Sequence, residues 1–265
     1  MLRRWFLLLS ILLLASFGAS VAGTSAAGAP DRAETKRVAI VIDDFGNAMD
    51  GTEEMFALPA PITVAVMPFL PTTKRDAEEA HRRGHEVIVH LPMEPVRGKR
   101  SWLGPGAITT DLSDREIKNR VAAAIDDVPH ARGMNNHMGS KATADPRVMR
   151  IVMEVCRERG IYFLDSRTTG KSQAGTMADQ VGVPVVANDL FLDEIYTASH
   201  VDKQLRKLNR LLERRSDTIV IGHVGPPGRI TAAGLRGAIE RLRDETAFVR
   251  VSDLLPLPDP APLWR

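Results

Sequence analysis

Residues 38–44 read Val-Ala-Ile-Val-Ile-Asp-Asp, and this stretch decides the fold. Its first five residues are apolar without interruption, a pattern typical of a β-strand that is buried on both faces. Strands of that kind occur mainly in parallel sheets covered by helices. Two carboxylates follow at once, Asp43 and Asp44, and adjacent buried acids are unfavourable unless a cationic group lies beside them. The stretch therefore predicts a parallel α/β fold with a charged site where its first strand ends.

The rest of the chain repeats this alternation of strands and helices. Further short apolar runs occur at residues 62–66, 87–89, 161–164, 183–187, 218–221 and 248–251, with a weaker one at 132–135. Two of the helical patterns between them have clear ends. Ser113 and Glu116 form a capping box, and Gly160 stops a helix that begins at Asp145 and Pro146. About seven or eight βαβ-type units in a single domain favour an α/β fold of the (β/α) barrel class over a doubly wound sheet.

The first 35 residues have the composition of a targeting segment and a linker. Arg3 and Arg4 precede an apolar run of about 13 residues, which is shorter than the ~20 that a membrane-spanning helix needs. Small residues follow, and Ser20-Val21-Ala22 favours cleavage over the alternative of an uncleaved anchor. We therefore expect an exported protein of the periplasm or cell envelope. Its predicted parts are a signal peptide over residues 1–22, a flexible linker over 23–35, the barrel over 36–255 and a proline-rich tail over 256–265.

Charge and motifs exclude several classes of partner. The sequence has 35 Lys and Arg against 33 Asp and Glu, a net charge of +2 that becomes 0 without Arg3 and Arg4. A neutral, mixed surface argues against nucleic acid and against an anionic membrane face, leaving an uncleaved N-terminal segment as the only expected membrane contact. The glycine-rich nucleotide motifs GxGxxG and GxxxxGK[ST] are absent. The only cysteine, Cys156, allows no intramolecular disulfide.

Polar side chains stand at the predicted strand ends throughout the chain. They are Asp43-Asp44, His90, Asn135-Asn136-His137, Asp165-Ser166-Arg167, Asn188-Asp189 with Asp193, and His223. Each one alone could be a helix N-cap or a hydrogen-bonded structural residue. In a barrel, however, all of these strand ends meet at one rim, where active sites lie. One carboxylate and two imidazoles, Asp44 with His90 and His137, make a three-ligand set for a divalent metal, most suitably Zn²⁺, with a position left for water.

The stretch 91–111 has no clear period and is long for a loop in a compact domain, which is typical of a functional segment. Its Trp102 is a candidate wall of a substrate groove. Asn135 and Asn136 are candidates to bind substrate hydroxyl or acetyl groups, or else to fix their loop. Arg167 and Asp189 complete the predicted substrate-binding set.

The motifs that carry these residues resemble a known family. GHEVIVH, residues 84–90, looks like the GHEIGNH stretch of polysaccharide deacetylases. IVIDDFG, HLPMEP, GMNNHMGS, FLDS and IGH together closely resemble the divergent polysaccharide deacetylase family over nearly all of residues 37–255. The resemblance implies a distorted (β/α) barrel and metal-assisted removal of acetyl groups from an N-acetylated sugar polymer.

The resemblance also implies roles for individual residues. Asp43 matches the general base, Asp44 the metal-binding aspartate, His90 the first histidine of a His-x-x-x-His ligand pair, His223 the general acid and Asp165 an aspartate that orients catalytic groups. The second histidine of the ligand pair is missing.

Glu94 stands at the position of that missing histidine. Either His137 or Glu94 is therefore the third ligand. Because the ligand pair is broken, a non-catalytic envelope protein that binds glycan or a partner remains the alternative to a deacetylase, and a metal-dependent esterase or phosphoesterase is a third reading.

Overall fold

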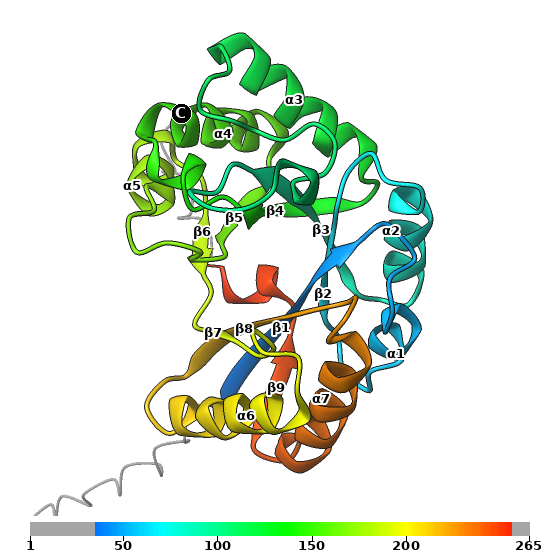
Figure 1. Cartoon of the computed structure of the whole chain (residues 1–265). Coiled ribbons are helices and arrows are strands. Elements are labelled where there is room, and N and C mark those ends of the chain that lie inside the picture. Colours follow the sequence, from blue (N-terminus) through cyan, green and yellow to red (C-terminus); the bar gives the residue numbers. More distant parts are fainter. Residues whose placement is uncertain (1–34, 256–265) are drawn as a thin grey trace, which may run out of the picture. The chain divides into compact units, whose positions relative to one another are not determined.

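The computed structural model describes residues 35–255 (Figure 1). The predicted signal peptide and tail, and nearly all of the predicted linker, lie outside the described residues. The strands are β1 (Lys36–Phe45), β2 (Thr63–Val66), β3 (Glu86–Met93), β4 (Ala131–Met138), β5 (Tyr162–Asp165), β6 (Val185–Ala187), β7 (Leu190–Phe191), β8 (Asp217–His223) and β9 (Thr246–Val249). The α-helices are α1 (Thr52–Phe56), α2 (Thr73–Arg82), α3 (Asp114–Asp127), α4 (Pro146–Arg159), α5 (Ala174–Val181), α6 (Ala198–Leu212) and α7 (Gly228–Leu242). Short 3₁₀ turns occur at Arg100–Trp102 (η1), Ala142–Ala144 (η2) and Val251–Leu254 (η3).

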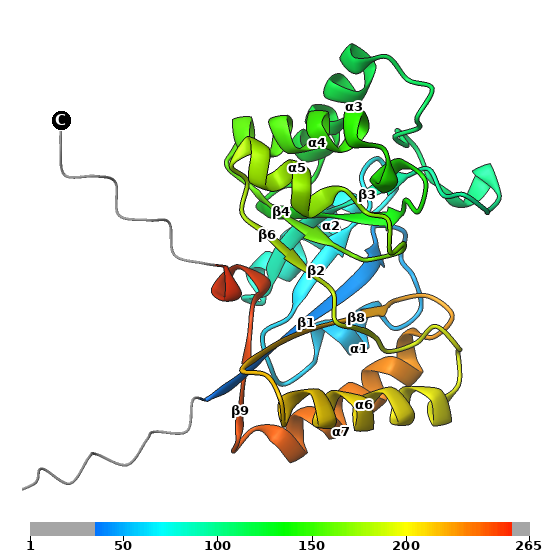
Figure 2. The same cartoon turned by 90° about the vertical axis from the view of Figure 1, so that its left-hand side faces the viewer.

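The strands form one parallel sheet in the order β6-β5-β4-β3-β2-β1-β8-β7, and β9 pairs with the first half of β1. The sheet curls into a half-barrel with the helices outside it, α3 to α5 against one part and α6 and α7 against the other (Figures 1 and 2). The predicted α/β barrel class is therefore confirmed, in an open form. Only Asn188 and Asp189 separate β6 from β7. Parallel neighbours need a much longer crossover, so these two edge strands cannot pair to close the ring.

Two apolar cores lie on the two faces of the sheet. Val38, Ile40 and Ile42 belong to the outer core beneath the helices, whereas Ala39 and Val41 belong to the inner core inside the curl. Successive side chains of a strand point to opposite faces, so a strand buried on both sides needs the unbroken apolar run seen in the sequence. By this alternation Asp43 follows Val41 onto the inner face.

The 3₁₀ turn η3 packs against the inner core at the end of the sheet where β2 and β3 begin. Val251 is fully buried there, and its backbone N–H donates to Thr63 Oγ1 at 3.0 Å. The N–H of Ser252 donates to Glu86 Oε2 at 3.3 Å. These contacts seal the end of the curl at which the strands begin, so the interior opens at the other end, where the predicted site residues lie.

The predicted helix ends are correct where the sequence carries capping signals. The capping box of Ser113 and Glu116 begins α3. The carboxylate of Asp145 accepts from the first backbone N–H groups of α4, and Gly160 ends that helix in the left-handed conformation at φ 66°. An N-cap of this kind contributes about 1 kcal/mol. The sequence did not predict α1 and α5, because α1 is very short and α5 buries only small residues and one methionine.

Strands β3 and β4 extend further than their apolar runs predict. Their pairing continues from His90↔Asn135 to Met93↔Met138, so the polar residues predicted to end these strands lie inside them. The ladder of backbone hydrogen bonds continues because these polar side chains find partners inside the fold. This correction decides which face each of them occupies.

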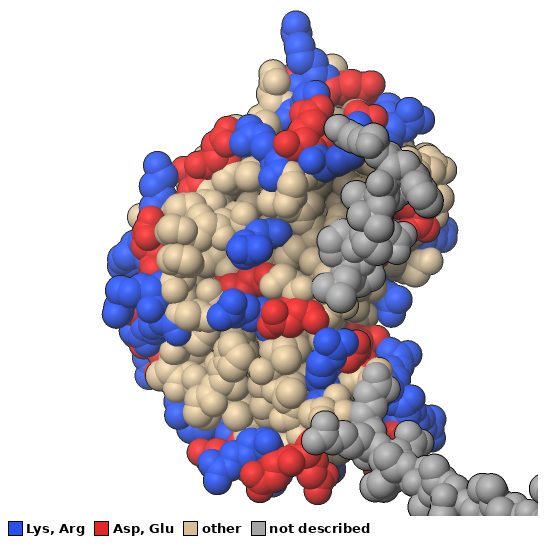
Figure 3. All heavy atoms as spheres, turned by 180° about the vertical axis from the view of Figure 1, so that it is seen from behind, with Lys and Arg blue, Asp and Glu red and all other residues tan. Residues whose placement is uncertain are grey.

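Charged side chains of both signs are mixed over the visible surface. Figure 3 shows Lys and Arg interspersed with Asp and Glu around broad areas of other residues on the face seen from behind. Within residues 35–255, no helix combines the length and the apolar character required to cross a bilayer.

Candidate active site

Asp43 and Asp44 are brought to the same face by an irregularity in β1. The register between β1 and β2 shifts between Ile42 and Phe45, and Asp44 has a φ of 72°, in the left-handed region. In a regular strand two adjacent residues would point to opposite faces. The bulge turns Asp44 back toward the interior, so that both carboxylates lie beside His90. His90 Nε2 is 3.7 Å from Asp43 Oδ2 and 3.2 Å from Asp44 Oδ1.

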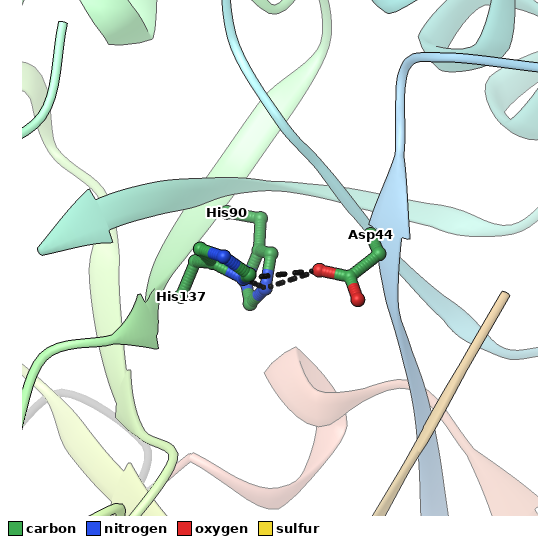
Figure 4. Close-up of side chains that lie close together, drawn as sticks. All are labelled: Asp44, His90 and His137. Carbon is green, nitrogen blue, oxygen red and sulfur yellow. Dashed lines mark hydrogen bonds and ion pairs between the residues drawn. The ribbon is translucent and has the colours of Figure 1, made fainter. Parts of the chain in front are cut away.

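Three predicted ligands converge at this point (Figure 4). Asp44 Oδ1 lies 3.2 Å from His90 Nε2 and 3.0 Å from His137 Nδ1, and the two ring nitrogens are 3.2 Å apart. One donor atom from each residue could therefore reach a common ion. Zn²⁺ bonds of about 2.0–2.2 Å require donor atoms this close or slightly further apart.

The outer nitrogen of each histidine is held by an acceptor. His90 Nδ1 lies 2.7 Å from Asn135 Oδ1, and His137 Nε2 lies 3.1 Å from the carbonyl oxygen of Trp102. The amide of Asn135 is oriented by its own N–H donation to Asp43 Oδ1 at 2.8 Å, so its oxygen faces the ring. With its proton on the outer nitrogen, each imidazole would offer the lone pair of its inner nitrogen to a metal beside Asp44. One carboxylate oxygen and two such nitrogens fit a divalent metal.

The electrostatics separate the two aspartates. Burial opposes ionisation of Asp44, but the contacts with His137 and His90 outweigh it and hold the pKa of Asp44 well below its ordinary value. Burial raises the pKa of Asp43 above its ordinary value, against the lowering by His90 and His223. Asp44 is thus held as an anion, while Asp43 is a more basic carboxylate.

His223 faces Asp43 from the neighbouring strand. The two residues are register partners at the ends of β8 and β1. His223 Nδ1 lies 2.7 Å from Asp193 Oδ1, and the other oxygen of Asp193 accepts from the His223 backbone N–H and from Thr231 Oγ1, each at 2.8 Å. Burial lowers the pKa of His223, but Asp193 and the nearby Asp44 and Asp43 raise it to about 9. The imidazole is therefore protonated at neutral pH.

A sequence profile of the divergent polysaccharide deacetylases matches residues 40–255, which include every residue of this cluster. The chain belongs to the divergent polysaccharide deacetylase family.

The chain is also similar to individual proteins in sequence and in structure. The chain is 36% identical to the uncharacterised protein YibQ of Escherichia coli K12 over 219 residues, 83% of this chain and 67% of YibQ. It is 35% identical to an uncharacterised protein of Haemophilus influenzae over 218 residues, 82% of this chain and 76% of that protein. The crystal structure of the uncharacterised protein ATU2773 from Agrobacterium tumefaciens C58 has the same fold, with a TM-score of 0.77 at 23% identity over 84% of this chain and 90% of that one.

Membership of the family makes the position of Asp165 informative. Asp165 lies two residues after Phe163 in β5 and therefore points to the same, outer face of the sheet, where Phe163 packs in the outer core. Its Oδ1 accepts from the N–H of Arg167 at 2.8 Å. The carboxylate therefore caps the turn after β5. The acid that contacts the catalytic candidate His223 is Asp193, and the role of Asp165 in orienting catalytic groups stays a prediction. Sequence spacing could only mark Asp193 as one of several acids after a strand.

The two predicted asparagines lie on opposite faces of β4. Asn135 shares the inner face with His137 and contacts the cluster, as described above. Asn136 points the other way: its Oδ1 accepts from Ser166 N at 3.0 Å, and its Nδ2 donates to Met138 O at 2.7 Å. Of the two predicted roles for Asn136, this placement favours fixing the loop over binding substrate.

Arg167 and Asp189 make their contacts away from Asp44, His90 and His137. Arg167 is exposed on the β5–α5 loop, and its guanidinium donates to Asn188 O at 3.3 Å. Asp189 pairs with Arg215 and accepts from the N–H of Ile219 at 3.0 Å, near the start of β8 and four residues from His223. This position at the far end of the strand does not support the prediction that Asp189 binds substrate.

Glu94 is engaged outside the cluster. Its Oε1 pairs with Lys141 Nζ at 2.8 Å, and its Oε2 accepts from the N–H and the hydroxyl of Thr110, each at 2.8 Å. Burial raises the pKa of Glu94, but these donors outweigh it and lower the pKa overall. Of the two candidates for the third ligand, the geometry selects His137, and Glu94 anchors the long loop that carries Trp102.

This difference is testable by metal analysis. His137→Ala is expected to lower metal affinity by at least about 10-fold, because it removes a donor atom from the cluster. Glu94→Gln should leave the metal content unchanged, because Glu94 contacts Lys141 and Thr110 instead of the metal ligands. The amide also keeps the size of the side chain. His130→Ala, which removes a partly exposed histidine paired with Glu78, is the control. Loss of metal from Glu94→Gln with retention in His137→Ala would reverse the assignment.

Proposed function

We propose that the protein is an exported, metal-dependent hydrolase that removes acetyl groups from N-acetylated sugars of a polysaccharide or cell-wall glycan. The observation that carries the proposal is the pairing of Asp43 and His223 across β1 and β8, beside three side chains suited to hold a metal. A protein that only binds glycan needs a metal site or a groove, but has no use for a base and a protonated acid facing the same point. Export rests on the expected signal peptide.

Asp44, His90 and His137 would hold the metal, most suitably Zn²⁺ because the set is one carboxylate and two imidazoles. When bound, a divalent ion polarises the carbonyl of the acetamide and makes the attacking water more acidic. Asn135 and the Trp102 carbonyl fix the orientation of the two rings. Such outer partners raise the basicity of the ligands and hold the rings in one orientation.

Asp43 is suited to accept the proton of the attacking water. Its side chain is only 2% exposed, and the N–H of Asn135 holds one of its oxygens. The raised pKa of Asp43 makes it a stronger base than an ordinary carboxylate. Water then adds to the acetyl carbon as its proton moves to Asp43.

His223 is suited to protonate the leaving nitrogen. An amine leaves an amide only after it receives a proton, so the acid must be charged at the start of the step. Asp193 occupies Nδ1 and leaves Nε2 to deliver the proton. The C–N bond breaks, the acetyl group leaves as acetate and the sugar retains a free amine. Release of acetate from an N-acetylated glycan, lost on chelation of the metal, is the direct test.

The pH profile tests the role of Asp193. Because His223 must be protonated, kcat/KM is expected to fall as the pH rises through about 9. Asp193→Asn removes the negative charge that raises this pKa, so the alkaline limb should move to lower pH by about one unit or more. Asp189→Asn is the matched control, since Asp189 lies in the preceding turn but pairs with Arg215. An alkaline limb that is the same in Asp193→Asn and wild type would remove Asp193 from this role.

A further inference from the structure

The exposed large apolar side chains of the described residues all lie on one rim. Phe69, Val96, Trp102, Ile195 and Tyr196 are 39–68% exposed. Each belongs to a loop that follows a strand: Phe69 follows β2, Val96 and Trp102 follow β3, and Ile195 and Tyr196 follow β7. These are the loops at the carboxyl ends of the strands, where the candidate active site lies. Apolar surface concentrated in one place indicates a contact site.

The two aromatic rings on this rim with the greatest exposure, Trp102 and Tyr196, are each 58% exposed. In the sheet order, β3 and β7 lie two strands away from β1 in opposite directions. Since β1 carries the two aspartates, the two loops flank the site from opposite sides.

Each ring also lies on a loop that contacts or holds a residue of the candidate site: His137 for Trp102 and His223 for Tyr196. The carbonyl oxygen of Trp102 lies 3.1 Å from His137 Nε2, so this loop is fixed to the metal-binding half. Tyr196 follows Asp193 by three residues, and Asp193 holds His223. Phe69 supports the Trp102 loop, because its ring lies so close to Gly106 that a Cβ there would meet it at 2.8 Å.

We propose that Trp102 and Tyr196 are stacking platforms for sugar rings on either side of the reacting sugar. The substrate is then a glycan chain that crosses the site and is held by several consecutive units, rather than a single terminal sugar. The inference rests on the proposed function, in that the reacting acetamide lies between the two platforms.

The chemistry of the rim favours a glycan over a lipid surface. A pyranose ring has an apolar face of C–H groups that packs on an aromatic ring, and polar groups around its edge. Lys99 Nζ lies over the Trp102 ring, 5.6 Å from its centre, and supplies a donor at that ring. The rings also stand on separate loops on the two sides of a polar cluster, whereas insertion into a membrane calls for one continuous apolar face.

Binding can be measured without turnover in the Asp43→Asn protein. The probes are β-1,4-linked N-acetylglucosamine oligomers of two and six sugars, titrated calorimetrically into the metal-loaded protein. We expect the longer oligomer to bind at least about 10-fold more tightly. Trp102→Ala and Tyr196→Ala should each weaken binding of the longer oligomer by about 10-fold and remove most of the length dependence. Trp102→Phe and Tyr196→Phe keep a ring and should retain most of the affinity.

The outcomes separate this inference from the proposed function. Ring-dependent, length-dependent binding supports the platforms even if the wild-type protein releases no acetate, a result that would refute only the deacetylase. Equal affinity for both oligomers, no binding of the longer one, or no effect of either alanine variant would overturn the platforms even if acetate is released. Ring-dependent sedimentation with phosphatidylglycerol vesicles and no oligomer binding would overturn them in favour of a membrane contact.

Discussion

Asp43→Asn is expected to lower acetate release by about 10²–10⁴-fold while leaving the metal content at the wild-type level. The amide keeps the size of the carboxylate and can still accept from Asn135, so the surroundings are preserved. It cannot take a proton from water. Metal should remain because Asp44, His90 and His137 are unchanged. Acetate release and metal content are measured on the same purified protein.

The control is Asp50→Asn, which makes the same chemical change in the exposed loop after β1. It should behave like wild type in both measurements. Activity of Asp43→Asn within a few-fold of wild type would show that Asp43 is not the base. Full complementation of a deletion strain by Asp43→Asn would favour the non-catalytic alternative, whatever the metal analysis showed.

Asp44→Asn should instead remove the metal and the activity together. Asparagine tolerates the left-handed backbone conformation that Asp44 adopts, so this variant changes the charge with little strain. The loss of the anion facing both histidines should weaken metal affinity by at least about 10–100-fold. Isothermal titration of the apo-protein with Zn²⁺ measures the change.

Asp44→Ala separates the effect of the negative charge at this position from the effect of its left-handed backbone conformation. It loses the same charge, and alanine in the left-handed region costs about 1 kcal/mol of stability in addition. Thermal unfolding of the two apo-variants should therefore show Asp44→Ala as the less stable. Unchanged zinc affinity in Asp44→Asn would mean that the metal is held elsewhere.

The sequence was sufficient for the parts of the site that depend on strand order and polarity. The unbroken apolar run before Asp43 required a strand buried on both faces, and such strands in sequence with helices required a parallel sheet. Because parallel strands end at one rim, Asp44, His90 and His137 could be grouped although 93 positions separate the first from the last. The structure places these three together.

The remaining details depend on tertiary contacts that a local pattern does not contain. The left-handed conformation of Asp44 arises from its pairing environment, and nothing in the residues around it marks the bulge. The continuation of β4 through Asn135 and His137 depends on partners in other strands. Asp193 could be identified as the partner of His223 only when the loop after β7 was seen beside the end of β8.

The position of β1 in the sheet also affects the order in which the molecule is built. The strand that carries both aspartates pairs with β8 and β9, and Arg37 is bonded to Asp217, 180 residues later. During synthesis, therefore, only β2 is available to pair with β1, along its last residues. The pairing with β8 and β9 must wait until these later strands have been made. Long-range pairing of this kind is slow to form. The histidines of β3 and β4 are therefore made long before β8, which completes the pairing of the strand that carries the two aspartates.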